Sequence, residues 1–77
     1  MLTLRRLLKV VFDCRFYIIA TNEAKETVTL YDDRLADEEC LRNVLDEFGY
    51  KPVTYVSIDE VDNVLCIEIE TEYEQVD

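Results

Sequence analysis

The spacing of apolar residues along the chain changes several times, and each change predicts a boundary between a helix and a pair of strands. Leu4, Leu7, Leu8 and Val11 recur at helical spacing behind Thr3, a residue that suits a helix N-cap. The first segment is therefore predicted to be a helix that begins at Leu4.

From Cys14 the apolar residues recur at every second position instead. Such alternation, rich in aromatic and β-branched residues, is typical of strands and predicts one over residues 14–21. Both of its faces are fairly apolar. Residues 22–25 form a polar connection of hairpin length, after which residues 27–31 alternate again. Together these residues predict a first β-hairpin.

Helical spacing returns after the hairpin. Asp37 is the expected N-cap of a second helix, and Gly49 is its expected end, with Pro52 shortly beyond. The apolar stripe of this helix consists of Leu41, Val44, Leu45 and Phe48.

The last third predicts a second hairpin. Residues 53–58 and 64–71 alternate, and the polar residues 59–63 between them suit a turn. Two sets of residues are expected to face opposite ways from the last strand: Leu65, Ile67 and Ile69 inward, and Cys66, Glu68 and Glu70 outward. Residues 72–77 are expected to fray.

The succession helix, strand, strand therefore occurs twice, which predicts an α+β fold of the order αββαββ. We expect one domain over residues 1–77, with a four-stranded antiparallel sheet and both helices packed on one face. A shift of 37 positions lays Leu4 on Leu41 and Leu7 on Val44, which fits either an internal duplication or a shared pattern. The expected core consists of Leu8, Ile18, Leu30, Leu45, Phe48 and Ile67.

The charge is strongly negative and unevenly distributed. Eighteen acidic and eight basic residues give a net charge of −10, and every basic residue lies at or before Lys51. The eight carboxylates after Pro52 thus have no basic neighbour in sequence. Such a segment repels nucleic acid and anionic membranes and attracts basic protein surfaces. We expect a basic protein surface as partner, and neither nucleic acid nor a membrane.

The residue types that most enzymes need are scarce. There is no histidine, the single serine, Ser57, lacks an activating motif, and Gly49 is the only glycine. A carboxylate pair such as Glu68 and Glu70 offers catalysis only as a minor alternative to a solvated strand face, and residues 59–63 lack the ligand pattern of a calcium loop. We therefore expect no enzyme, no metal site and no cofactor.

The cysteines and the apolar runs bear on the compartment. Cys14, Cys40 and Cys66 form no C-x-x-C pair, and we expect them to be reduced, buried thiols, with Cys14 and Cys66 in strands. No apolar run reaches the roughly 20 residues that span a bilayer, and the first dozen residues lack the order of a secretory signal. The expected location is the cytoplasm.

Tyrosines give the sheet a second candidate surface. Tyr17, Tyr31 and Tyr55 are expected to share a sheet face with Ile19, beside the outward carboxylates. Aromatic side chains are enriched at protein interfaces, although exposed sheet faces also carry tyrosine for structural reasons.

The layout of the whole chain, with its acidic final strand from Val64 to Glu70, resembles short accessory proteins of bacteriophages and prophages, a pool that includes anti-CRISPR proteins. The resemblance implies a phage-encoded inhibitor that blocks a nucleic-acid-binding host protein, such as a CRISPR effector, from within the host cytoplasm. The expected binding residues are Glu68, Glu70, Asp59, Glu60 and Asp62, with Tyr17, Tyr31 and Tyr55. The alternative is a small assembly module that self-associates, for example as a homodimer, through the tyrosine-bearing sheet face.

Overall fold

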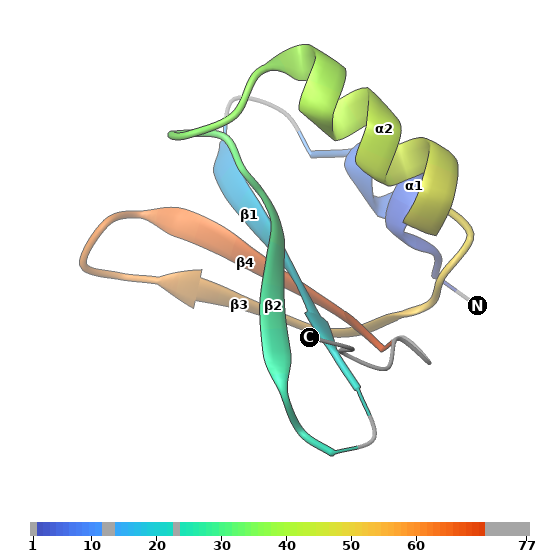
Figure 1. The fold of residues 1–77 in the computed structure, drawn as a ribbon. Coiled ribbons are helices and arrows are strands. Elements are labelled where there is room, and N and C mark those ends of the chain that lie inside the picture. Colours follow the sequence, from blue (N-terminus) through green and yellow to red (C-terminus); the bar gives the residue numbers. More distant parts are fainter. Residues whose placement is uncertain (1, 12–13, 23, 71–77) are drawn as a thin grey trace.

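A computed structural model describes residues 2–11, 14–22 and 24–70 of the chain. It confirms an α+β fold with the predicted order of helices and strands (Figure 1). The elements are α1 (Leu4–Leu8), β1 (Arg15–Thr21), β2 (Thr27–Asp32), α2 (Glu38–Phe48), β3 (Val53–Asp59) and β4 (Val64–Glu70). The predicted frayed segment 72–77 lies outside the described residues.

Both helices begin at their predicted caps. The Thr3 hydroxyl accepts a hydrogen bond from the backbone N–H of Arg6 at 3.3 Å, and the Asp37 carboxylate accepts one from the backbone N–H of Cys40 at 3.0 Å. Each cap satisfies a backbone donor that has no partner inside its own helix.

Helix α1 is shorter than its apolar stripe suggests. It ends at Leu8, because the next two backbone N–H groups, of Lys9 and Val10, bond to the carbonyls of Arg6 and Leu7, three residues earlier. Bonds of this spacing tighten the chain into a final 3₁₀ turn.

Helix α2 ends before Gly49, as predicted, but for a different reason from the usual left-handed cap. Gly49 has a φ of −59°, which any residue can adopt. A side chain there would instead meet the carbonyl oxygen of Leu45 and the Arg5 guanidinium, whose Nε would lie 3.0 Å from an added Cβ atom. Since Arg5 Nη2 also donates to the Leu45 carbonyl at 2.8 Å, the glycine allows α1 to approach the end of α2.

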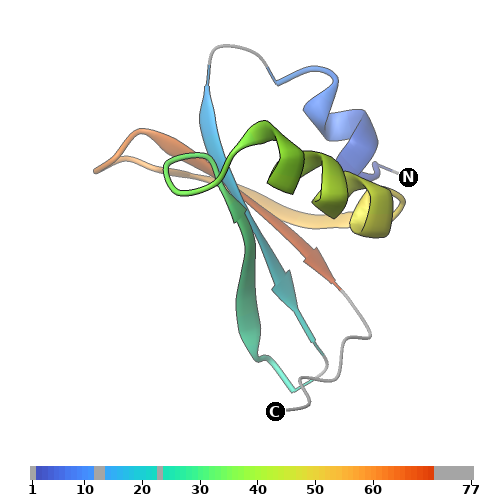
Figure 2. The same ribbon diagram turned by 45° about the horizontal axis from the view of Figure 1, so that its top comes forward.

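The sheet is mixed, so the prediction of a purely antiparallel sheet is wrong. Its strand order is β2-β1-β4-β3, in which both hairpins are antiparallel but β1 and β4 pair in parallel. The long connection through α2 lets the second hairpin place its last strand, rather than its first, against β1 (Figure 2).

The order of the strands follows their apolar content. β1 and β4, which carry apolar residues on both faces, occupy the centre, where each has a neighbouring strand along both of its edges. β3 contains Thr54 and Ser57 among its apolar residues and lies at the edge, where most of it is exposed.

The two helix-strand-strand segments do not occupy equivalent places in the sheet. The first strand of the first segment, β1, is central, whereas the first strand of the second segment, β3, is at the edge. The helices also differ, with 5 residues in α1 and 11 in α2. The sheet therefore has no two-fold relation of the kind that the 37-residue shift suggests.

The core unites helices and strands in one buried cluster. Its members are Leu4, Ile18, Ala20, Tyr31, Val44, Ile67 and Ile69. Of the six predicted core residues, Ile18 and Ile67 are fully buried. The other four, Leu8, Leu30, Leu45 and Phe48, are half-buried and pack against the cluster. Leu4 and Ile69 are fully buried in the cluster and were absent from the predicted core.

The thiols differ in environment. Cys66 is buried in β4, Cys40 is half-buried in α2, and none of the three cysteines forms a disulfide. The prediction is wrong for Cys14, which precedes β1 and is exposed. Among the described residues, no helix is both long enough and apolar enough to cross a bilayer.

Candidate functional site

The candidate binding residues concentrate on one face of the sheet. The register pairs Tyr17 with Cys66, Ile19 with Glu68 and Thr21 with Glu70, so the side chains of these pairs share a face. We call this the outer face; the core face is the one that carries Ile18 and Ile67. Tyr55 also lies on the outer face, because it pairs with Glu68.

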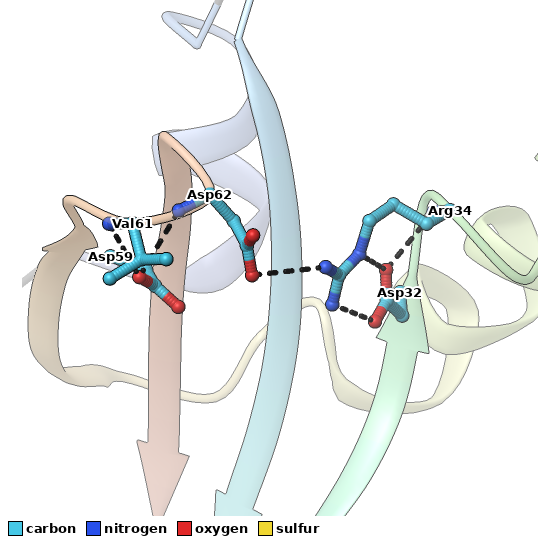
Figure 3. Close-up of polar contacts among 5 residues, drawn as sticks. All are labelled: Asp32, Arg34, Asp59, Val61 and Asp62. Carbon is cyan, nitrogen blue, oxygen red and sulfur yellow. Dashed lines mark hydrogen bonds and ion pairs between the residues drawn. The ribbon is translucent and has the colours of Figure 1, made fainter.

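One end of the outer face carries an ion-pair network (Figure 3). Arg34 donates to the Asp32 carboxylate through Nε at 3.1 Å and Nη2 at 3.0 Å, and its Nη1 lies 3.4 Å from the Asp62 carboxylate. Hydrogen bonds from the Arg34 side chain and backbone lower the pKa of Asp32 below its ordinary value. The network thus joins the end of β2 to the β3–β4 turn, so Asp62 is already paired within the chain.

The acidic turn between β3 and β4 also uses its own carboxylates. The Asp59 carboxylate accepts hydrogen bonds from the backbone N–H groups of Val61 at 3.0 Å and Asp62 at 3.4 Å. Asn63 has a φ of 55°, a left-handed conformation that asparagine tolerates. The Asp59 carboxylate therefore stabilises the turn. Asp59 is half-buried, whereas Glu60 is exposed.

Glu68 is bound within the sheet. Its carboxylate accepts hydrogen bonds from the hydroxyl of Thr21 at 3.0 Å and the hydroxyl of Thr54 at 3.3 Å, and it is half-buried. Glu68 therefore links β1 and β3 across β4. Glu70 is exposed.

A shallow pocket lies at this end of the sheet. It has a volume of about 140 Å³ and is lined by Thr21, Asn22, Lys25, Thr54, Glu68 and Glu70. The lining is mostly polar, and it combines one ammonium with two carboxylates.

Tyr17 and Cys66 meet at the centre of the outer face. A side-chain hydrogen bond with Cys66 and partial burial raise the pKa of Tyr17 to about 12. Cys66 is buried although it shares the outer face with Tyr17, so its predicted direction and its predicted burial are both confirmed. The contact makes Tyr17 a structural part of this face, and Tyr17 is itself half-buried.

Tyr31 does not lie on the outer face, and its predicted placement there is wrong. The pairing of β1 with β2 contains a β-bulge between Ile18 and Ile19, which sets Tyr31 opposite Ile18. Tyr31 is consequently buried in the core, with its ring centroid 5.4 Å from that of Phe16. Of the three predicted tyrosines, Tyr55 alone is largely exposed.

Helix α2 carries an acidic surface that the sequence patterns did not single out. Glu38, Glu39, Asp46 and Glu47 are all exposed, with Arg42 as the one basic residue of the helix. The last turn has no basic residue to offset Asp46 and Glu47. The acidic content of residues 38–47 is the signal that could have identified this surface.

The described residues contain no group of three or more cysteine, aspartate or glutamate side chains that could hold a metal ion. No protein-family model matches the chain, and comparisons with curated proteins and with solved structures found no match. The fold and the site therefore carry the functional argument by themselves.

Proposed function

We propose that this protein is a non-enzymatic inhibitor that binds a basic protein surface. The observation that carries the proposal is the exposed acidic surface of α2. Glu39 and Asp46 are seven residues apart, so they lie on the same side of the helix about 10 Å from each other. Carboxylates fixed on an ordered helix can contact lysine and arginine without the entropic cost of ordering a tail.

The position of these carboxylates supports a role beyond folding. Acidic side chains near a helix C-terminus oppose the helix dipole and lower helix stability. The final turn of α2 has no basic residue of its own beside Asp46 and Glu47, and the Arg5 guanidinium of α1 at this end donates to the Leu45 carbonyl. Because they do not stabilise the helix end, a contact with a partner accounts for them better than folding does.

The carboxylates of the second hairpin contribute less than the sequence suggested. Asp59, Asp62 and Glu68 have partners within the chain, which would have to be given up or shared on binding. Glu60 and Glu70 are exposed. Glu70 lies on the outer face of the sheet, whereas α2 contributes Val44 to the cluster on the core face, so the proposed binding surface is α2.

The proposed target is a nucleic-acid-binding protein, since carboxylates at such a surface would occupy the place of phosphates. A CRISPR effector of the host is the specific form of this proposal, in line with the resemblance to phage accessory proteins.

A second inference concerns how the helices pack on the sheet. We infer that both helices cover the core face, because Leu4 of α1 and Val44 of α2 belong to the buried cluster of Ile18.

The test uses a binding assay with a CRISPR effector ribonucleoprotein and compares two variants in which selected acidic side chains are replaced by their neutral amides. One variant combines Glu38→Gln, Glu39→Gln, Asp46→Asn and Glu47→Gln. The control combines Glu26→Gln with Glu70→Gln, two exposed acids that lie outside α2. We expect the α2 variant to weaken binding by about tenfold or more, and to reduce its salt dependence. If both variants bind with equal affinity at low and high salt, α2 is not the binding surface.

Self-association is a second candidate function. The aromatic outer face supports it less than expected, since Tyr31 is in the core and Tyr17 is half-buried. The exposed apolar residues of β3 favour it instead.

A further inference from the structure

Strand β3 leaves part of its outer side open. Its start is covered, because the N–H of Val53 donates to the Leu2 carbonyl at 2.9 Å and Thr3 forms a bridge with Pro52. From Tyr55 to Asp59, no other strand of the described part of the chain pairs with this edge. Backbone donors and acceptors on an open edge can pair with another strand.

The composition of this edge favours pairing. Tyr55, Val56 and Ile58 are 60%, 42% and 64% exposed, and no charged residue occurs from Val53 to Ile58. Proteins usually protect edges with lysine, proline or a central bulge. The bulge of β3 lies at its start, between Val53 and Tyr55, and leaves the rest regular.

The opposite edge of the sheet is less suited to pairing. The irregularity of β2 lies within the strand, at the level of Ile18 and Ile19. Beyond the end of β2, the Asp33 carboxylate accepts from the N–H of Phe16 at 2.9 Å, so this end of the strand is turned back onto β1. The open apolar edge is therefore a property of β3.

The two ends of β3 carry opposite charge. At its C-terminal end lie Asp59 and the exposed Glu60 and Asp62. At its N-terminal end lies Lys51, whose carbonyl accepts from the N–H of Leu4 at 2.9 Å and thereby brings α1 and its exposed arginines beside it. A strand with opposite charges at its ends is complementary to itself when two copies run antiparallel.

We propose that β3 pairs antiparallel with β3 of a second copy of this chain, about a two-fold axis near Ser57. The pairing would place the acidic turn of each copy beside the Lys51 end of the other. It would also bring Val56 of one copy opposite Ile58 of the other on the same face, and form one sheet across both copies. The inference rests on the self-association candidate and is independent of the acidic surface of α2.

A lysine within the edge tests the pairing. Ile58→Lys adds a positive charge to the pairing stretch at a position that is 64% exposed, so the monomer should fold normally. Leu35→Lys is the matched control, because Leu35 is 86% exposed outside the strands and gives the same change in charge. Sedimentation equilibrium should show a dimer for the wild type and for Leu35→Lys. For Ile58→Lys, the dimer dissociation constant should rise by about tenfold or more.

Charge reversal tests the antiparallel arrangement. Lys51→Glu and Glu60→Lys should each weaken the dimer, because each places like charges together. An equimolar mixture of the two variants should associate again, since each copy then supplies the charge that the other lacks. A mixture as weak as the separate variants would contradict the antiparallel arrangement.

The remaining outcomes separate self-association in general from pairing through β3 in particular. A dimer that survives Ile58→Lys but is lost in Tyr17→Ala would keep self-association and overturn pairing through β3. A wild-type protein that stays monomeric at its highest soluble concentration would overturn both. Neither result would decide inhibition, because binding to the effector is measured separately with the α2 variants.

Discussion

The Arg34 guanidinium lies 3.4 Å from the Asp62 carboxylate, and this contact joins the end of β2 to the turn that precedes β4. Arg34 is also bound to Asp32, two residues earlier, so it connects two segments that the sequence places 28 residues apart. The negative charge of the last third of the chain is therefore partly balanced in space although it is unbalanced in sequence.

Replacement of Arg34 should change how stability depends on pH. Asp32 has a lowered pKa in the folded state, so its contribution to stability is present above the ordinary carboxyl pKa of about 4 and is lost as the pH falls through the folded value. Arg34→Gln should reduce this loss. Urea unfolding between neutral and acidic pH should give a shallower acid slope for Arg34→Gln than for the wild type. Parallel slopes would show that the Asp32–Arg34 pair contributes nothing to the pH dependence of stability.

Tyr17 should resist ionisation at high pH. Its pKa is raised from 10.0 to about 12, so the folded state retains the proton longer than the unfolded state does. Its contribution to stability is fully present below pH 10 and is lost as the pH rises towards 12. Burial also raises the pKa of Tyr31, so the phenolate absorbance titration is made in a Tyr31→Phe background. There, Tyr17→Phe should remove the late step and the exposed-site variant Tyr55→Phe should leave it in place. A late step retained in Tyr17→Phe would assign it to another residue.

The buried cluster should dominate stability. Ile67→Ala removes a fully buried side chain and should lower the free energy of unfolding by about 2–5 kcal/mol. Leu35→Ala, at a position that is 86% exposed and outside the strands, should change it by less than about 0.5 kcal/mol. Chemical denaturation of the two variants measures both values. Similar values for the two variants would contradict the burial of Ile67 in the core.

Glu68 and Glu70 should differ in their effect on stability. Glu68→Gln alters two hydrogen bonds to threonine hydroxyls and should lower the free energy of unfolding by about 1 kcal/mol. Glu70→Gln should have almost no effect, because Glu70 is exposed at the end of β4. Thermal melts of the two variants under identical conditions provide the comparison, and equal melting temperatures would count against the bonded arrangement of Glu68.

Neutralising the C-terminal end of α2 should stabilise the protein. Asp46→Asn with Glu47→Gln removes two charges that oppose the helix dipole, and each change should raise the free energy of unfolding by about 0.3–1 kcal/mol. The same double variant should bind the effector more weakly. Lower stability in this variant would indicate that the two acids have a structural role after all.

The hydrophobic pattern predicted the elements well and their arrangement only partly. The caps at Thr3 and Asp37 depend on nearby residues, and both were predicted correctly. Strand order depends on which hairpin strands meet, and alternation alone carries no information about it. The apolar residues on both faces of β1 and β4 could have indicated their central places.

The candidate site was harder to predict for the same reason. The bulge opposite Ile18 shifts the phase of β2, and this moved Tyr31 from the expected face into the core. The partners of Glu68 come from β1 and β3, so its bonds arise only when β4 is placed between them. Residues that alternate outward in a sequence can therefore still be engaged within the sheet.

Competition with nucleic acid tests the central proposal most directly. The fluorescence anisotropy of labelled target DNA on a CRISPR effector ribonucleoprotein would be followed while this protein is added at low and high salt. The proposal predicts that the wild type displaces the DNA, with an effect that declines as salt is raised, and that the variant carrying Glu38→Gln, Glu39→Gln, Asp46→Asn and Glu47→Gln displaces it about tenfold less effectively. DNA that stays bound at every concentration of the wild type, or that the neutral variant displaces equally well, would contradict it.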